Sequence, residues 1–174
     1  QSQAARDAIL SEESVRTAME HARHVDIAVV GLGDVGPECT MVRTGHLQAE
    51  DVAALRERGY RLGIVTNGVP DLQRTKLEGA GLNAAFDAVV ISGEIDCGKP
   101  EPGIFHHICR ALAVEPGEAV MVCDNPARDV AGGRAAGLRT VWVQRLGRAR
   151  DPRHPADLEC TDLAAILPWL DRLA

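Results

Sequence analysis

Short β-branched runs alternate with amphipathic stretches from residue 61 to residue 143, and this alternation constrains the fold more than any other feature of the chain. Four apolar runs predict buried strands, at residues 61–65, 87–91, 119–123 and 139–143. Helical patterns fill the intervals, at residues 70–79, 103–113 and 127–136. A strand that is joined to the next strand through a helix returns to the sheet in the same direction. The chain is therefore expected to form an α/β fold around a parallel sheet.

Further elements are expected on both sides of this alternating region. Additional helices are predicted over residues 12–23, 48–58 and 162–172. Residues 25–30 are β-branched and end at a glycine, which predicts another buried strand. The stretch 146–159 is rich in Arg, Pro and Asp and is interpreted as a surface loop. A single domain over residues 1–174 with five or six parallel strands is the expected architecture.

Charge and cysteine content exclude several functional classes. The net charge is −6, so no basic field would attract nucleic acid or an anionic membrane. Apolar runs are short and interrupted by Gly, Asp or Arg, and no signal peptide or membrane-spanning segment is predicted. The five cysteines are widely spaced and include no Cys-x-x-Cys pair, which is typical of reduced thiols. The expected location is the cytoplasm.

Polar residues follow the ends of the predicted strands. Thr66 and Asn67 follow the strand at 61–65, and Asp124 follows the strand at 119–123. Lys99 lies in the loop after a third strand, and it is one of only two lysines in the chain. Ligands of open parallel sheets bind at the carboxyl ends of the strands. Hydroxyl, ammonium and carboxylate groups at that edge suit a phosphoryl group and a divalent cation.

Three segments carry a family resemblance. They are Leu62-Gly-Ile-Val-Thr-Asn-Gly68, Gly98-Lys-Pro-Glu-Pro-Gly-Ile-Phe105 and Met121-Val-Cys-Asp-Asn-Pro-Ala-Arg-Asp-Val130. In this order and spacing, residues 52–174 resemble the core of a haloacid dehalogenase (HAD) superfamily hydrolase of the phosphatase branch. The resemblance implies a three-layer Rossmann-like parallel sheet and hydrolysis of a small phosphate ester with Mg²⁺.

The resemblance also implies roles for individual residues. Thr66 would hold the transferred phosphoryl group, and Lys99 would steady its charge. Asp124 would bind Mg²⁺, and Asp129 would support the metal shell. The positions expected to contact phosphate are Gly31, Gly33, Thr66, Asn67, Gly68 and Lys99. Cys123 stands where the family usually has glycine.

The chain departs from the family at its first motif. The family's first strand ends in Asp-x-Asp-Gly-Thr, whose first aspartate is the nucleophile and whose second is the general acid and base. This pattern does not occur in the sequence, and neither does the cap domain that selects substrate. If the strand at 25–30 fills that place, Gly31 and Gly33 fall where the two aspartates belong. Asp34 lies one residue further on and is a candidate replacement nucleophile, although a loop aspartate is the simpler interpretation.

The first third of the chain resembles a different family. The segments are Val25-Asp-Ile-Ala-Val-Val-Gly-Leu-Gly-Asp34 and Met41-Val-Arg-Thr-Gly-His-Leu-Gln-Ala-Glu-Asp-Val-Ala-Ala-Leu55. Residues 1–58 are thereby similar to the sugar-phosphate-binding domain of SorC/DeoR-type transcription regulators, without that family's DNA-binding helices. The join between the two resemblances is expected within the helix at 50–58. The strand at 25–30 would then lie between the strands at 61–65 and 119–123.

Several features have a plainer alternative. The glycines of Gly31-x-Gly33-x-x-Gly36 match a dinucleotide-binding pattern, but no helical pattern begins within it, so a glycine turn or a relic phosphate loop is preferred. Arg43 and His46 would contact an anionic effector by resemblance to the regulators, and a solvated loop is the simpler reading.

The functional hypothesis is a HAD-like, Mg²⁺-dependent phosphatase that is impaired or inactive because the nucleophile motif is missing, so enzymatic activity stays open. The alternatives are a sugar-phosphate-binding module without catalysis and a chimeric, spliced fragment without selected function. The expected partner is a small phosphorylated metabolite. A homodimer is also considered, because an incompletely covered central strand would expose apolar surface.

Overall fold

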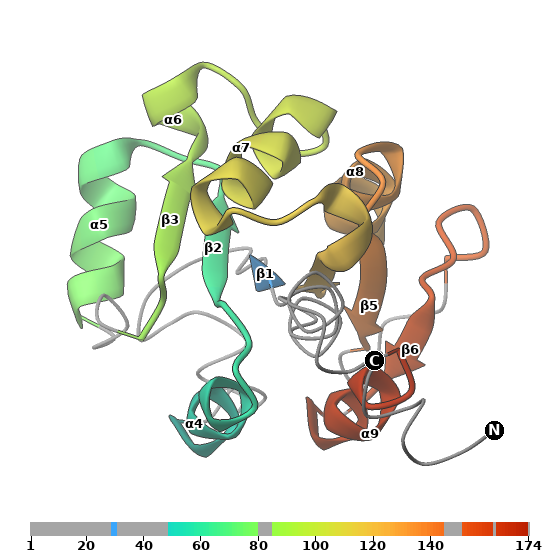
Figure 1. Ribbon diagram of the computed structural model, residues 1–174. Coiled ribbons are helices and arrows are strands. Elements are labelled where there is room, and N and C mark those ends of the chain that lie inside the picture. The colour runs from blue at the N-terminus through green and yellow to red at the C-terminus, as the bar shows by residue number, and fades with distance from the viewer. Residues whose placement is uncertain (1–28, 31–48, 80–84, 145–150, 162, 174) are drawn as a thin grey trace, which may run out of the picture.

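The computed structural model describes residues 29–30, 49–79, 85–144, 151–161 and 163–173. These residues form a six-stranded sheet in which all neighbouring strands are parallel, in the order β3-β2-β1-β4-β5-β6 (Figure 1). The strands are β1 (Val29–Val30), β2 (Gly63–Thr66), β3 (Ala88–Ile91), β4 (Val120–Cys123), β5 (Arg139–Val143) and β6 (Leu158–Cys160). The α/β class and the parallel sheet expected from the sequence are thus confirmed.

Helices connect the strands from β1 to β5 and cover both faces of the sheet (Figure 1). The α-helices are α4 (Ala49–Glu57), α5 (Pro70–Gly79), α6 (Ser92–Ile95), α7 (Pro102–Leu112), α8 (Ala131–Ala135) and α9 (Ile166–Leu170). Shorter turns are the 3₁₀ turns η1 (Pro116–Glu118) and η3 (Leu163–Ala165) and the π turn η2 (Pro126–Val130). Within the described ranges, every helix is too short or too polar to cross a bilayer.

Neighbouring residues of each central strand pack into different cores. On β2, Ile64 packs in the core that includes α4 and α9 residues, and Val65 packs in the core that includes α7 residues. On β4, Val122 packs in the first of these cores and Met121 in the second. All of these side chains are at most 3% exposed. Burial on both faces explains why the strands read as continuous apolar runs instead of alternating ones.

Strand β1 occupies the centre of the sheet. Val30 is in parallel register with Ile64 of β2 on one side and with Val122 of β4 on the other. This placement confirms the expected neighbours of the strand at 25–30, of which residues 29 and 30 belong to the described part. The rest of that strand and the helix at 12–23 lie outside the described residues.

The prediction of a surface loop over 146–159 was wrong at its end, where β6 adds a sixth strand. Asp157, just before β6, accepts hydrogen bonds from the backbone N–H and the hydroxyl of Thr140, at 2.7 and 2.9 Å. These bonds hold the segment against β5, so that Leu158 pairs with Val141. Pairing with an existing edge makes a strand of a segment whose own pattern is too short and polar to predict one.

The last helix is also shorter than predicted. Residues 162–172 were expected to form one helix, but the described chain makes the turn η3 and then the five-residue helix α9. Pro168 accounts for the division, because in a helix that began at residue 162 its ring would clash with the carbonyl of Ala164. In α9 it lies in the first turn, where its missing N–H has no helical partner to lose.

Four free cysteines lie in the described ranges, at positions 97, 109, 123 and 160. Cys109 packs on α7 and is 1% exposed. Burial raises the pKa of its thiol from 9.0 to about 11, and the nearby charge of Glu115 adds to the rise. The folded chain therefore keeps this proton at pH values at which the unfolded chain has released it.

We expect the stability of the protein to fall as the pH rises through the range between those two pKa values, because the unfolded state then binds fewer protons than the folded state. The measurement is the melting temperature at about pH 8 and about pH 10.5 for the parent and for Cys109→Ala. The variant should lose less melting temperature between the two conditions than the parent does. Equal losses would show that other groups, such as Tyr60, whose pKa is also raised by burial, cause the whole effect.

Candidate active site

The end of β2 places a buried hydroxyl at the carboxyl edge of the sheet. Thr66 is the last residue of β2, and its side chain is fully buried. Among the described residues its hydroxyl oxygen has no hydrogen-bond partner. The turn after β2 is held by α6, because the backbone N–H of Gly68 donates to the hydroxyl of Ser92 at 3.0 Å. A buried hydroxyl without a partner is costly, which is typical of a group kept for a ligand.

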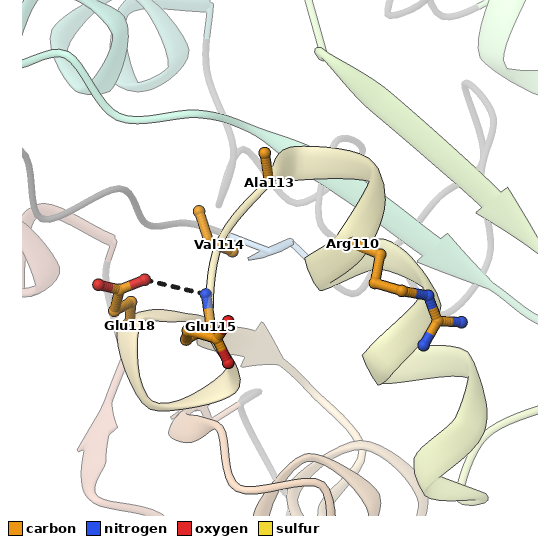
Figure 2. Close-up of a pocket in the computed structure, with 5 residues that line it drawn as sticks. All are labelled: Arg110, Ala113, Val114, Glu115 and Glu118. Carbon is orange, nitrogen blue, oxygen red and sulfur yellow. Dashed lines mark hydrogen bonds between the residues drawn. The ribbon is translucent and has the colours of Figure 1, made fainter.

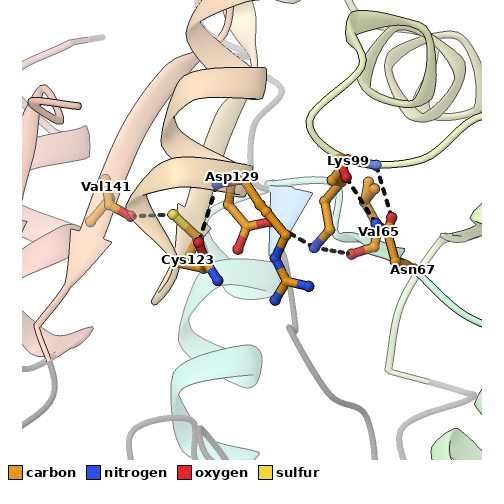
Figure 3. Close-up of polar contacts among 8 residues, drawn as sticks. Val65, Asn67, Lys99, Cys123, Asp129 and Val141 are labelled. Atoms are coloured by element: carbon orange, nitrogen blue, oxygen red, sulfur yellow. Dashed lines mark hydrogen bonds and ion pairs between the residues drawn. The ribbon is translucent and has the colours of Figure 1, made fainter. Parts of the chain in front are cut away.

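Lys99 and Asp129 form a buried ion pair at the same edge (Figure 3). The Lys99 Nζ lies 2.9 Å from Asp129 Oδ1, and the two side chains are 1% and 0% exposed. The ammonium also donates to the carbonyl oxygen of Val65 on β2, at 3.0 Å. The loop before α7, the end of β2 and the turn after β4 therefore meet at one point.

A side-chain amide holds the backbone of Lys99. Asn67 Nδ2 donates to the carbonyl oxygen of Lys99 at 2.9 Å, and Asn67 Oδ1 accepts from the Lys99 N–H at 2.8 Å (Figure 3). The two bonds are reciprocal, as in a pair of β-strands. They tie the loop that carries Lys99 to the end of β2.

The turn after β4 carries two carboxylates. Asp124 directly follows β4 and is 5% exposed, and Asp129 lies in the π turn η2. The N-cap of this turn is Asn125, whose side chain accepts from the N–H of Arg128 at 3.1 Å. Apart from the ion pair with Lys99, neither oxygen of Asp129 has a hydrogen-bond partner in the described part of the chain.

The helix after this turn approaches the Lys99 loop closely. A Cβ at Gly132 of α8 would lie 2.7 Å from the carbonyl oxygen of Pro100 and 2.6 Å from the ring of Phe105. Contacts this short do not occur, so glycine is required for the approach. The missing side chain thus lets the turn that carries Asp129 come within ion-pair distance of Lys99.

A haloacid dehalogenase-like hydrolase family model matches residues 47–137, which is more than half of the chain. The matched range includes the site residues Thr66, Asn67, Lys99 and Asp129. The chain belongs to the haloacid dehalogenase-like hydrolase family. A second model, that of a sugar-binding domain, matches residues 1–65. The two matches overlap over residues 47–65. The two-part resemblance expected from the sequence is confirmed, and the expected join at 50–58 lies inside the overlap.

Related HAD proteins are named phosphatases. The phosphoserine phosphatase of Thermus thermophilus is 51% identical over 115 residues, which cover 66% of this chain and 46% of that protein. The glyceraldehyde 3-phosphate phosphatase of Methanopyrus kandleri is 36% identical over 155 residues, covering 79% of this chain and 66% of that protein. The crystal structure of a HAD phosphatase from Thermococcus onnurineus matches with a TM-score of 0.65 and 40% identity, covering 70% of this chain and 55% of that one. This chain therefore spans between 46% and 66% of the length of these relatives.

The described residues do not by themselves fit the Mg²⁺ ion that HAD phosphatases generally use. Mg²⁺ requires about six oxygen ligands in octahedral geometry, with carboxylates among them. Within the described ranges, no group of three or more His, Cys, Asp or Glu side chains lies together as metal ligands would. Asp129 is already neutralised by Lys99.

Cys123, at the position where the family usually has glycine, packs against the ion pair. Its side chain is fully buried, and its thiol donates to the carbonyl oxygen of Val141 at 3.5 Å. Burial and the neighbouring charge of Asp129 raise the pKa of the thiol, so it stays neutral. Compared with the glycine that is usual in the family, the cysteine at position 123 adds volume to the site but no charge.

A shallow pocket of about 320 Å³ lies elsewhere, between the end of α7 and the turn η1 (Figure 2). Its lining residues are Arg110, Ala113, Val114, Glu115 and Glu118. This turn leads into the amino end of β4, whereas Asp124 follows the carboxyl end of the same strand. The pocket is therefore at the opposite edge of the sheet from the ion pair.

The structure brings together four of the expected site residues: Thr66, Asn67, Lys99 and Asp129. Gly68 lies in the same turn as Asn67, and Asp124 follows the same strand that precedes Asp129. The expected positions Gly31, Gly33 and Asp34, and the alternatives Arg43 and His46, lie outside the described residues. Sequence reasoning gave no role to the Val65 carbonyl or to the hydroxyl of Ser92, the first residue of α6, because a backbone oxygen and a single serine carry no distinguishing pattern.

Proposed function

We propose that this chain carries a HAD-type phosphate site for a small phosphate ester and that its hydrolytic activity is strongly impaired. The observation that carries the proposal is the buried ion pair of Lys99 and Asp129, together with the buried hydroxyl of Thr66, which follows Val65 on β2 and has no hydrogen-bond partner among the described residues. An ammonium has three donor protons, and the described part of the chain supplies two bonding partners, the Val65 carbonyl and the Asp129 carboxylate. The third proton and the Thr66 hydroxyl would donate to the oxygens of a phosphoryl group.

Binding without efficient turnover follows from the missing nucleophile motif. In the HAD mechanism implied by the resemblance, a carboxylate attacks phosphorus and forms an aspartyl-phosphate. The sequence has no Asp-x-Asp-Gly-Thr. Because Mg²⁺ would also lose a carboxylate ligand, we propose that the ion binds weakly here.

The names of the relatives support the class of ligand. Phosphoserine and glyceraldehyde 3-phosphate, which appear in those names, are small phosphate monoesters. Catalytic residues, in this proposal, are Thr66 and Lys99, with Asp34 as a weaker candidate nucleophile.

A second candidate function rests on the match of residues 1–65 to a sugar-binding domain. The chain would then be a hybrid single domain, with a regulator-like segment at 1–58 and a HAD-like core at 52–174. Such a module would bind a phosphorylated sugar without consuming it. The two candidates share the phosphate group and differ in whether a phosphorylated sugar binds much more tightly than inorganic phosphate.

The test is a pair of measurements on the same preparations: calorimetric binding of inorganic phosphate, and hydrolysis of 4-nitrophenyl phosphate with and without Mg²⁺. The variants are Asp124→Asn and the double variant Lys99→Met/Asp129→Leu, which replaces the buried pair by apolar side chains. Lys76→Met is the matched control, because Lys76 on α5 is the other lysine of the chain.

We expect the parent and Lys76→Met to bind phosphate, and the double variant to bind it at least about tenfold more weakly, since a charge-assisted hydrogen bond contributes more than 1.4 kcal/mol. Hydrolysis by the parent should be close to the blank, and any residual Mg²⁺-dependent rate should fall in Asp124→Asn. A parent that fails to bind phosphate would refute the proposal. Rapid turnover that survives in the double variant would place the chemistry elsewhere.

A further inference from the structure

We infer that Asn67 is a positioning residue, whose side-chain amide fixes the backbone of Lys99 so that the ammonium is held in place before a phosphate arrives. This inference rests on the proposed function and goes beyond it, because Asn67 is expected from the resemblance to touch phosphate itself. In the structure its amide is engaged on protein backbone instead.

The geometry of the amide is the first argument. Both polar atoms of the Asn67 side chain are used on one residue: Nδ2 donates to the Lys99 carbonyl at 2.9 Å, and Oδ1 accepts from the Lys99 N–H at 2.8 Å. These are well-formed lengths for N–H···O bonds. A side chain that bonds to both peptide units flanking Lys99 fixes the position and the direction of the backbone at that residue.

Lys99 is thereby held at both ends by two residues at the carboxyl end of β2, Val65 in the strand and Asn67 directly after it. Its backbone is bonded to Asn67, and its Nζ donates to the carbonyl oxygen of Val65 at 3.0 Å. Thr66, whose hydroxyl has no partner within the described ranges, is the residue between these two anchors. A free lysine side chain has many rotamers, and fixing it before binding removes that entropic cost from the binding step.

The orientation of Asn67 is itself fixed by its neighbours. Its backbone carbonyl accepts from the side chain of Gln73 at 3.3 Å. On the other side, a Cβ at Gly98 would lie 3.3 Å from Asn67 Oδ1 and 3.3 Å from the Cβ of Ser92. Glycine at 98 therefore leaves the space in which the amide meets the peptide of Lys99.

The two lysines of the chain make a direct spectroscopic test available. A sample labelled with [¹⁵N]lysine gives two backbone amide signals and two side-chain ammonium signals, from Lys99 and from Lys76, which serves as an internal reference. The variant is Asn67→Ala. The matched control is Asp157→Ala, because Asp157 also makes two hydrogen bonds to one residue, Thr140, next to β6.

In Asn67→Ala we expect the Lys99 amide to exchange faster and its ammonium signal to shift or broaden, while the Lys76 signals stay in place. The affinity for inorganic phosphate should fall at least about tenfold, equivalent to 1.4 kcal/mol. Asp157→Ala should lose thermal stability but keep the Lys99 signals and the phosphate affinity. A role in stability alone would affect the two variants alike and would leave the Lys99 ammonium unchanged.

The inference is overturned if Asn67→Ala is folded and keeps both its Lys99 ammonium signal and its phosphate affinity within about twofold. It is also overturned if phosphate affinity falls while the Lys99 signals stay unchanged, because Asn67 would then touch the phosphate directly. If the parent itself binds no phosphate, the proposed function fails. The positioning of Lys99 is then decided by the amide exchange and the ammonium signal alone.

Discussion

Replacing Asp129 by alanine is expected to lower the free energy of unfolding by about 3–5 kcal/mol, because it leaves an ammonium buried without its counter-charge. The two side chains are 1% and 0% exposed, so water does not replace the lost carboxylate. The Val65 carbonyl would remain as a neutral partner of Lys99, which is too weak to offset an unpaired charge. The measurement is unfolding by urea, followed by circular dichroism.

Two further variants separate the effect of the unpaired charge from that of the pair. Lys99→Met/Asp129→Leu removes both charges and should recover most of the stability, since apolar replacements of a buried pair are often neutral or stabilising. Glu94→Gln breaks the surface pair with Arg74, which is 55% exposed, and should change stability by less than about 1 kcal/mol. A loss for Asp129→Ala no larger than that of Glu94→Gln would show that the Lys99 site is hydrated and not buried.

Placing aspartates at positions 31 and 33 is expected to raise the hydrolysis of 4-nitrophenyl phosphate by at least about a hundredfold over the parent, the lower end of what a positioned catalytic group contributes. Residue 31 directly follows β1, which pairs with β2 and β4. Thr66 ends β2 and Asp124 follows β4. In the mechanism implied by the resemblance, a carboxylate oxygen at this edge attacks phosphorus, the ester oxygen leaves with its electron pair, and the second aspartate protonates it.

The control for this gain of activity is the pair Gly31→Asn/Gly33→Asn, which has nearly the same shape and no carboxylate. A second readout is metal binding: since the aspartate variant gains two carboxylates after β1, which pairs with the strand that precedes Asp124, Mg²⁺ should raise its melting temperature more than that of the parent. A folded aspartate variant with the activity of the parent would contradict the proposal that β1 takes the place of the missing HAD strand.

Local sequence patterns determined most of the sheet. The β-branched runs at 61–65, 87–91 and 119–123 became β2, β3 and β4 within two residues, because a strand buried on both faces must be apolar throughout. Helical connections make neighbouring strands parallel, and parallel strands carry their last residues to one edge. For that reason Thr66 and Asp124 could be placed at one edge from the sequence.

Tertiary structure decided the features that depend on a partner from elsewhere in the chain. Strand β6 forms where Asp157 bonds to Thr140 of β5. Its three residues, Leu158–Cys160, are too few to show a strand pattern in the sequence. The contact of Asn67 with Lys99 joins residues 32 positions apart. The close approach of α8 to the Lys99 loop depends on the Pro100 carbonyl and the Phe105 ring, which lie opposite Gly132.

The sequence by itself therefore determined the α/β class and the residue types at the carboxyl edge, and the central place of β1 was implied by the resemblance to the HAD family. Periodicity and the direction of the crossovers are local properties, and they can be read from one chain. The structure alone decided that Lys99 and Asp129 form a buried ion pair and that the Asn67 side chain bonds to the backbone of Lys99. Burial, pairing and hydrogen-bond direction are properties of atoms brought together by folding, and no pattern along the chain encodes their distances.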